Sequence, residues 1–501
     1  MVRALYIFSF RDAYEVFAKR AHSELGVIPV AWLGDPRGHA FAEESFGGHC
    51  LTADYRPLLA GTYIRPTFRP HDVVISFARF LDSNFFREIE GQLLNEFNRE
   101  THFSLLRTVD REARLRTVIH HLVGIYVDQR PEVLIASETP HGVVDLTAFY
   151  LAKWLGIPTL FFQPTSTIGP GLLPRTSLDE VFAIDSSTFN KPRVETLRSA
   201  FLKNTIALFS NGARPARMEA ELEKHNAAPS RTSSRRVFLQ RRFVSTILLL
   251  KNLLLESEWR KQLGLLVFST YRDVFATAVG SLPSTTASGP PTAFFPLHYQ
   301  PERTSLPEGG LEAFQCDLVV RARALLPPNV RLVVKEHPSS VTKHRVGYLG
   351  RSTNTFELVK SLPNTEMVGP DWDINENFES LVLCFTLTGS LGVQAALKGV
   401  PVIYFGNPWW QGMPGTTKHY EGMDLSGGLG DLGAAKSELV VDFLTTLTTS
   451  RTVPGFGTPS QERSWGKILN LPKEFFEAEL DGLLSVTKLF LEGLPTAAKS
   501  E

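Results

Sequence analysis

Residues 131–162, PEVLIASETPHGVVDLTAFYLAKWLGIPTLFF, decide the fold class of this chain. A short apolar run at 133–136 is followed by a turn cluster that ends at Gly142, and then by a segment with an apolar face near 3.6 periodicity. Gly156 and Pro158 stop that segment, and a second apolar run follows at 159–162. The order is that of a β-α-β unit, so the first half is predicted to contain a parallel sheet.

The same alternation of apolar runs and helical patterns returns in the second half. Apolar runs lie at 293–297, 330–335, 381–387 and 400–405, with helical patterns at 311–326, at 356–362 and from 391 onward. The stretch between the halves, 281–291, is small, polar and rich in proline, which is typical of a linker. The sequence therefore predicts an α/β protein of two domains, 1–280 and 292–501, joined at 281–291.

Length and composition limit the classes of function. A chain of 501 residues is longer than a single core of roughly 250–300 residues, so two Rossmann-like domains facing a cleft are expected, and clefts of this kind bind ligands. Lys and Arg number 52, as do Asp and Glu, which argues against a nucleic-acid partner. The three cysteines have no metal-ligand or disulfide spacing, and no apolar run approaches the ~20 residues that span a bilayer. A cytoplasmic protein is expected.

Two further segments have helical patterns of their own. Residues 231–268 combine arginines with many leucines, which fits either helices packed on the first sheet or contact with a membrane surface or a polyanionic acceptor. Between 475 and 490, apolar residues form one stripe, and we expect this helix to cross back over one of the domains.

Ligands bind at the carboxyl ends of parallel strands, so the residues that follow each predicted strand are the candidates for a site. After the apolar run at 330–335 come Lys335, Glu336, His337 and Pro338. A lysine can neutralise a diphosphate and a histidine can donate to a phosphate, while proline fixes the exit of the strand. The alternative is a surface turn with mixed charges.

A glycine-containing turn follows the apolar run at 381–387. It contains Thr388, Gly389, Ser390 and Gly392, and a helical pattern begins at 391. Glycines let a ligand approach the backbone, and the N–H groups and dipole of the following helix favour a phosphate. The turn has neither the GxGxxG nor the P-loop spacing, which disfavours a dinucleotide fold and a Walker ATPase. The alternative is a turn that only connects two elements.

Carboxylates follow two other predicted strands. Glu302 is a candidate general base or nucleophile and Arg303 a candidate clamp for an anionic group, with a structural Glu-Arg pair as the alternative. Glu138 and His141 leave the strand at 133–136 toward the same cleft, with a helix-capping turn as the alternative. The one Asp-x-Asp pair considered, Asp371 and Asp373, lies in a polar loop and not at a strand end. It is a weak candidate for binding a metal, and no metal site is expected.

Four segments together resemble the capsular polysaccharide biosynthesis proteins: 137–142, 297–304, 334–338, and 388–392 with 399–406. The resemblance is clearest over about residues 290–410. It implies a GT-B-like glycosyltransferase, similar to enzymes that transfer Kdo from its CMP-activated form, with His337 and Pro338 at the nucleotide. Many GT-B enzymes have a ribose-binding glutamate where this chain has Gln394, whose amide can still hydrogen-bond a ribose.

The expected function is that of a cytoplasmic glycosyltransferase in capsule or surface polysaccharide synthesis. Its donor would be a nucleotide sugar of the CMP-Kdo or UDP-sugar kind, its acceptor a glycan or glycolipid, and it would need no separate cofactor. Contact of 231–268 with the inner face of a membrane would make it a peripheral protein. Two alternatives stay open: a CDP-glycerol or ribitol-phosphate transferase of the teichoic-acid type, and a non-catalytic scaffold of the same fold.

Overall fold

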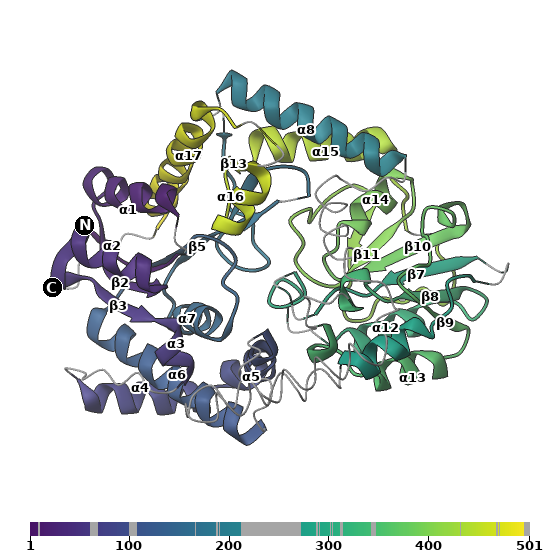
Figure 1. Cartoon of the computed structure of the whole chain (residues 1–501), viewed down its shortest axis with the longest axis horizontal. Coiled ribbons are helices and arrows are strands. Elements are labelled where there is room, and N and C mark those ends of the chain that lie inside the picture. The colour runs from purple at the N-terminus through teal and green to yellow at the C-terminus, as the bar shows by residue number, and fades with distance from the viewer. Residues whose placement is uncertain are drawn as a thin grey trace, which may run out of the picture.

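The chain folds into two β-sheets covered by helices, as seen in a computed structural model (Figure 1). The structure describes residues 1–8, 11–60, 69–99, 108–165, 167–186, 189, 191–211, 272–286, 289, 291–300, 302, 304–310, 314–341, 347–430, 432–466, 469 and 471–494. The predicted α/β class with two Rossmann-like sheets is confirmed.

The first sheet has seven strands, most of them from the first third of the chain. They are β1 (Val2–Ile7), β2 (Val27–Gly34), β3 (Leu51–Asp54), β4 (Val133–Ala136), β5 (Thr159–Pro164), β6 (Gly171–Arg175) and β13 (Val453–Pro454). Their order is β13-β6-β5-β4-β1-β2-β3. The pairs from β5 to β3 are parallel, whereas β6 runs antiparallel to both of its neighbours.

The second sheet has six strands, and all of its pairs are parallel. They are β7 (Thr292–Pro296), β8 (Arg331–Lys335), β9 (Thr365–Val368), β10 (Leu381–Thr386), β11 (Val402–Tyr404) and β12 (Thr416–Lys418). Their order is β12-β11-β10-β7-β8-β9. The apolar runs of the second half therefore became strands.

Helices cover both faces of each sheet. In the first half they are α1 (Asp12–Leu25), α2 (Pro36–Phe46), α3 (Tyr55–Ala60), α4 (Pro70–Asp82), α5 (Asn84–Glu96), α6 (Thr108–Gln129), α7 (Val143–Trp154) and α8 (Pro192–Ser210). Strand β1 shows the reason: Leu5 and Ile7 pack in one core with α4 to α7, whereas Ala4 and Tyr6 face the core that holds α1. A strand buried on both faces has no polar alternation, as in the sequence.

In the later part of the chain the helices are α12 (Gln315–Leu325), α13 (Asn354–Ser361), α14 (Leu391–Leu397), α15 (Ser437–Ser450), α16 (Pro459–Gly466) and α17 (Lys473–Glu492). Helix α8 lies beside α15 and also contacts α14 (Figure 1). Leu202 and Phe209 of α8 belong to the same buried cluster as Leu444 of α15. The two halves therefore share one hydrophobic core along α8.

The chain returns to the first sheet near its end. Strand β13 pairs with β6, and α17 packs against α1, so α16 and α17 lie with the first half in Figure 1. The expected crossing-back of the C-terminal helix is thus confirmed. The buried Arg11 guanidinium holds this segment: its Nη1 lies 2.6 Å and its Nη2 3.0 Å from the two oxygens of Glu479 on α17.

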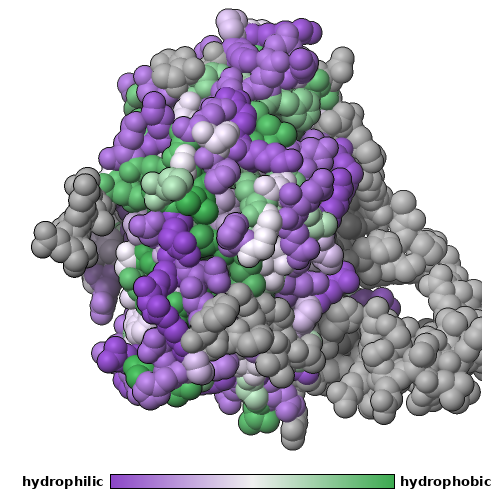
Figure 2. Space-filling model, turned by 90° about the vertical axis from the view of Figure 1, so that its left-hand side faces the viewer, coloured by the Kyte–Doolittle hydropathy of each residue, from purple (hydrophilic) through white to green (hydrophobic). Residues whose placement is uncertain are grey.

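The segment predicted to be a linker is packed where the structure describes it. Leu282 is buried, and the backbone carbonyl of Pro283 accepts a hydrogen bond from Gly369 N at 2.9 Å. The basic region 231–268 lies outside the described residues. None of the described helices is both long and apolar enough to cross a bilayer. Figure 2, which views the first half from outside, shows a largely hydrophilic face with apolar residues interspersed.

Candidate functional site

Each sheet has a point at which its strand order reverses. In the first sheet this point lies between β1 and β4, and in the second between β7 and β10. The connections from two such strands leave toward opposite faces of the sheet, which opens a crevice at the strands' carboxyl ends. In the second sheet, the segments that follow β7, β10 and β8 are the three that sequence analysis singled out, and these strands are neighbours.

His298, just after β7, lies beneath the glycine turn that follows β10. Its Nε2 accepts a hydrogen bond from Thr388 N at 3.4 Å and lies 3.2 Å from Thr386 Oγ1. A Cβ on Gly389 would come within 3.0 Å of that Nε2, so only glycine fits here without a shift. The backbone of His298 is held by Gln315 of α12, whose Oε1 accepts from His298 N at 2.6 Å. The two strand ends form one unit.

His298 is neutral in this position. Burial lowers its pKa to about 4, and the positive charge of Arg351 acts in the same direction. Because Nε2 accepts a backbone hydrogen bond, the proton of the neutral ring is on Nδ1. Among the described residues Nδ1 has no hydrogen-bond acceptor, and 8% of the residue stays exposed. His298 can therefore offer an N–H donor without carrying a charge.

The glycine turn also presents backbone donors. Gly389 N donates to Thr386 Oγ1 at 3.1 Å, and Gly392 N donates to the carbonyl of Gly389 at 3.0 Å. The N–H groups of Ser390 and Leu391 have no acceptor within the part of the chain that the structure describes, and both residues are half-buried. Two N–H donors at a half-buried turn suit an anionic ligand.

Lys335 and His337 follow β8, on the other side of β7. Lys335 is buried and its ammonium donates to the backbone carbonyl of Trp372, in the loop after β9. His337 is half-buried, and its Nδ1 accepts from Ser339 N at 3.1 Å, so the neutral ring carries its proton on Nε2. Pro338 begins a short 3-10 turn at Pro338–Val341. The His337 ring faces Tyr299, with the ring centroids 6.2 Å apart.

Glu336 lies below this edge, fully buried. One oxygen accepts from Ser340 Oγ at 2.9 Å, and the other lies 3.3 Å from Arg351 Nη1. Arg351 Nη2 in turn donates to the backbone carbonyl of His298 at 2.5 Å. Glu336 thus fixes the position of His298 through Arg351, which is consistent with a positioning role for this carboxylate.

Gln394 on α14 touches the same loop as Lys335. Its Nε2 donates to Asn375 Oδ1 at 3.1 Å, and the residue is 8% exposed. Within this loop, Asp373 Oδ1 accepts from Asn375 N at 2.9 Å, which makes a local turn. Among the described residues no group of three or more His, Cys, Asp or Glu side chains is placed to hold a metal ion.

A tight turn at 304–310 lies between the two sheets. Thr388 Oγ1 donates to the carbonyl of Thr304 at 2.5 Å, and Thr304 Oγ1 donates to Glu302 Oε2 at 3.3 Å. The half-buried Glu302 therefore lies near the glycine turn. Arg303, the predicted clamp, lies outside the described residues. Glu308 is buried in the same turn, and its backbone carbonyl accepts a hydrogen bond from Asn407 N at 2.7 Å.

The first half reaches this turn through the residues after β4. Thr139 Oγ1 donates to Glu308 Oε1 at 2.9 Å. Glu138 is 6% exposed, and its Cβ lies 3.0 Å from the position of a Cβ added to Gly457. Gly457 belongs to the C-terminal segment with β13, α16 and α17, here called the returning segment. His141 is half-buried, with Nδ1 2.9 Å from the Thr139 carbonyl, which makes it the donor. The segment 138–141 therefore lies where the two halves meet.

Sequence reasoning did not single out three residues of this region. His298 belongs to a quoted segment, but a histidine after a strand gives no sign that it will lie under a turn 90 residues later. Arg351 and Glu308 belong to no motif. Their roles arise from contacts with residues far along the chain, and a pairing of that kind leaves no local signal.

Comparisons with known proteins add only distant likeness. No family model matches the sequence, and a search of curated proteins finds no match. Among solved structures, a Thermosulfurimonas dismutans KpsC, beta Kdo 2,4 transferase, is 9% identical with a TM-score of 0.26, over 64% of this chain and 85% of that one. A UDP-GlcNAc 2-epimerase from Methanocaldococcus jannaschii is 11% identical with a TM-score of 0.21, over 93% and 99% of the two chains.

The calicheamicin glycosyltransferase CalG4 is 11% identical with a TM-score of 0.20, over 99% of both chains. TM-scores of this size do not extend to shared activity. What this chain does is therefore argued from its own topology and side chains.

Proposed function

We propose that this chain is a glycosyltransferase that takes a sugar from a nucleotide-activated donor and adds it to a glycan or glycolipid of a cell-surface polysaccharide. The nucleotide would bind at the β7/β10 switch point of the second sheet. The observation that carries the proposal is the meeting of neutral His298, the half-buried Gly389–Leu391 turn and His337 at one edge of that sheet.

The leaving nucleotide phosphate needs hydrogen-bond donors that are already in place. The N–H groups of Ser390 and Leu391, the Nδ1–H of His298 and the Nε2–H of His337 are donors of this kind. Preorganised donors stabilise developing negative charge without rearrangement during the reaction. Because His298 is neutral, it binds the phosphate as a dipole and does not titrate at neutral pH.

The acceptor hydroxyl needs a base. Glu302 is half-buried and is joined to the glycine turn through Thr304, so it is our first candidate, with Glu138 and His141 as candidates from the first half. A carboxylate within hydrogen-bond reach of the hydroxyl would take its proton as the glycosidic bond forms and the nucleotide leaves. No metal or cofactor is part of this mechanism, and we expect turnover to persist after EDTA treatment.

The first test is binding. We would measure the melting temperature of the purified chain with CMP, CDP, UDP and GDP. A ligand at 100 times its dissociation constant adds about 2.7 kcal/mol to the stability of the folded state, which is easily measured. We expect one nucleotide to raise the melting temperature. No shift with any of the four would favour a non-catalytic scaffold.

The second test is transfer. Sugar release from CMP-Kdo and from a UDP-sugar should be compared with glycerol-phosphate release from CDP-glycerol, each with a glycan acceptor. Transfer of a sugar supports the proposal. Transfer of glycerol phosphate alone would replace it by the teichoic-acid type of reaction, which uses a similar nucleotide.

A further inference from the structure

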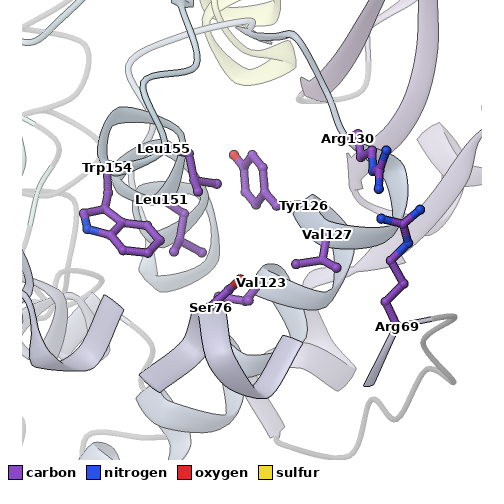
Figure 3. A pocket seen from close by; sticks show the side chains of 9 residues that line it. All are labelled: Arg69, Ser76, Val123, Tyr126, Val127, Arg130, Leu151, Trp154 and Leu155. Carbon is purple, nitrogen blue, oxygen red and sulfur yellow. The ribbon is translucent and has the colours of Figure 1, made fainter. Parts of the chain in front are cut away.

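A hollow in the first half is lined by no residue of the strand ends that form the two switch points. It is formed by α4, α6 and α7, has a volume of about 270 Å³, and contacts no residue of the proposed nucleotide site. Figure 3 shows the side chains that line it. None of its lining residues is one of the site residues predicted from the sequence.

The two ends of the hollow differ in chemistry. One end is apolar and is lined by Leu151, Trp154 and Leu155 at the end of α7. The side chain of Leu155 is 44% exposed to solvent. At the other end, the side chains of Arg69 and Arg130 point toward each other in Figure 3. The middle is lined mainly by apolar side chains of α6, among them Val123 and Val127.

The two arginines are exposed, and neither has an acidic partner among the ion pairs of the described residues. Two cations at one end of a hollow repel each other, and an anion between them removes that repulsion and can accept from both. A phosphate fits this geometry, because guanidinium groups match its oxygens. The apolar end gains free energy when a hydrocarbon chain covers it.

We propose that this hollow binds an amphiphile with a phosphate head and a single apolar chain, the head between Arg69 and Arg130 and the chain toward Trp154. A volume of about 270 Å³ equals that of roughly nine waters in the liquid, which suits a short length of chain and not a whole lipid. The site does not depend on the proposed glycosyltransferase activity, since none of its residues contacts the switch point.

The test measures binding of octyl phosphate, below its micelle concentration, to the full chain by calorimetry. Octyl glucoside supplies the same chain with a neutral head, and inorganic phosphate supplies the head alone. We expect one octyl phosphate per chain, with both reference compounds at least tenfold weaker. Equal binding of octyl glucoside would overturn the role of the arginines, and equal binding of inorganic phosphate would overturn the role of the chain.

Variants assign the site. The double change Arg69→Gln with Arg130→Gln should weaken octyl phosphate at least tenfold, whereas Arg451→Gln, an exposed arginine after α15, should leave it unchanged. Leu155→Gln should weaken octyl phosphate but not inorganic phosphate. All four positions are exposed, and circular dichroism melting checks that each variant folds. Unchanged binding by the double variant would overturn the proposal, and so would an equal loss with Arg451→Gln.

Discussion

The two switch points of this molecule differ in what covers them. At the first, between β1 and β4, the returning segment fills the edge: Tyr14 Oη donates to the carbonyl of Phe456 at 2.6 Å, and a Cβ on Gly457 would lie 2.9 Å from Pro164. At the second, between β7 and β10, a neutral histidine and two backbone N–H groups remain without protein acceptors among the described residues. The switch point of the first sheet therefore anchors the C-terminal segment of the chain. In our proposal, the switch point of the second sheet binds the nucleotide.

The difference extends to charge. The first switch point holds a compensated pair, Arg11 with Glu479, in which the guanidinium and the carboxylate are both buried. The second holds a histidine whose charge is suppressed by burial and by Arg351. In a buried ion pair the two charged groups already bind each other, so neither is available to a ligand. The N–H of neutral His298, at a half-buried turn, is not committed to a protein partner among the described residues.

The largest effect on stability is expected from removing the Arg11–Glu479 ion pair at the first switch point. Arg11→Ala leaves the Glu479 carboxylate buried without its partner, which should cost about 3–5 kcal/mol of the free energy of unfolding. Urea unfolding followed by tryptophan fluorescence measures this. Lys360→Ala, which removes the exposed ion pair with Glu357 on α13, is the control and should change little. An Arg11 variant as stable as the control would mean that the returning segment is not anchored there.

His298 at the second switch point should make the free energy of unfolding depend on pH. The pKa of His298 is about 4 in the folded chain and about 6.5 when unfolded, so the unfolded state binds the extra proton first. This contribution is fully present above pH 6.5 and is lost as the pH falls toward 4, by up to about 3 kcal/mol. Unfolding free energies at several pH values should show a shallower loss in His298→Gln. Parallel pH curves would mean that His298 is not buried as a neutral ring.

A change at Glu302 separates chemistry from binding. Glu302→Gln keeps the shape and the acceptor for Thr304 Oγ1 but removes the base, so turnover should fall by about 100-fold while nucleotide affinity stays the same. Steady-state kinetics and calorimetry on the same preparation measure both. A joint fall of affinity and stability would instead identify a structural carboxylate, and unchanged turnover would direct the search to Glu138 and His141.

His337→Ala should give a smaller effect, on binding alone. The imidazole is half-buried and contributes one donor to a phosphate, so its loss should cost about 1.5–3 kcal/mol of nucleotide binding with little change in melting temperature. Calorimetry with the nucleotide found by the melting screen measures it. Wild-type affinity in a folded variant would remove His337 from the site.

The fold was predictable because its evidence is local. The apolar run at 133–136 and the helix-stopping residues Gly156 and Pro158 belong to one continuous stretch of the sequence. The structure has β4, α7 and β5 in this stretch. Strands β7, β8, β10 and β11 of the second sheet were predictable for the same reason, whereas β9 and β12 were not among the predicted runs. Apolar runs of five to seven residues bounded by turns leave few alternatives when both faces of a sheet are buried.

The site was predictable only in part. Strand ends are visible in the sequence, and these drew attention to Lys335, His337 and Gly389. What each side chain touches is not visible there: Lys335 turns to the Trp372 carbonyl, and Glu336 is buried against Arg351. Such pairings depend on the packing of loops that are far apart in the chain, so no local pattern encodes them.

In our proposal, the nucleotide phosphate binds at the glycine turn of the second switch point. The variant Ser390→Asp, with Ser390→Ala as the matched control, tests this placement of the phosphate. A carboxylate there would occupy the anion site and repel the phosphate, so calorimetry should show nucleotide binding weakened far more by the aspartate than by the alanine. Equal affinity in the two variants, both folded, would mean that the phosphate binds elsewhere.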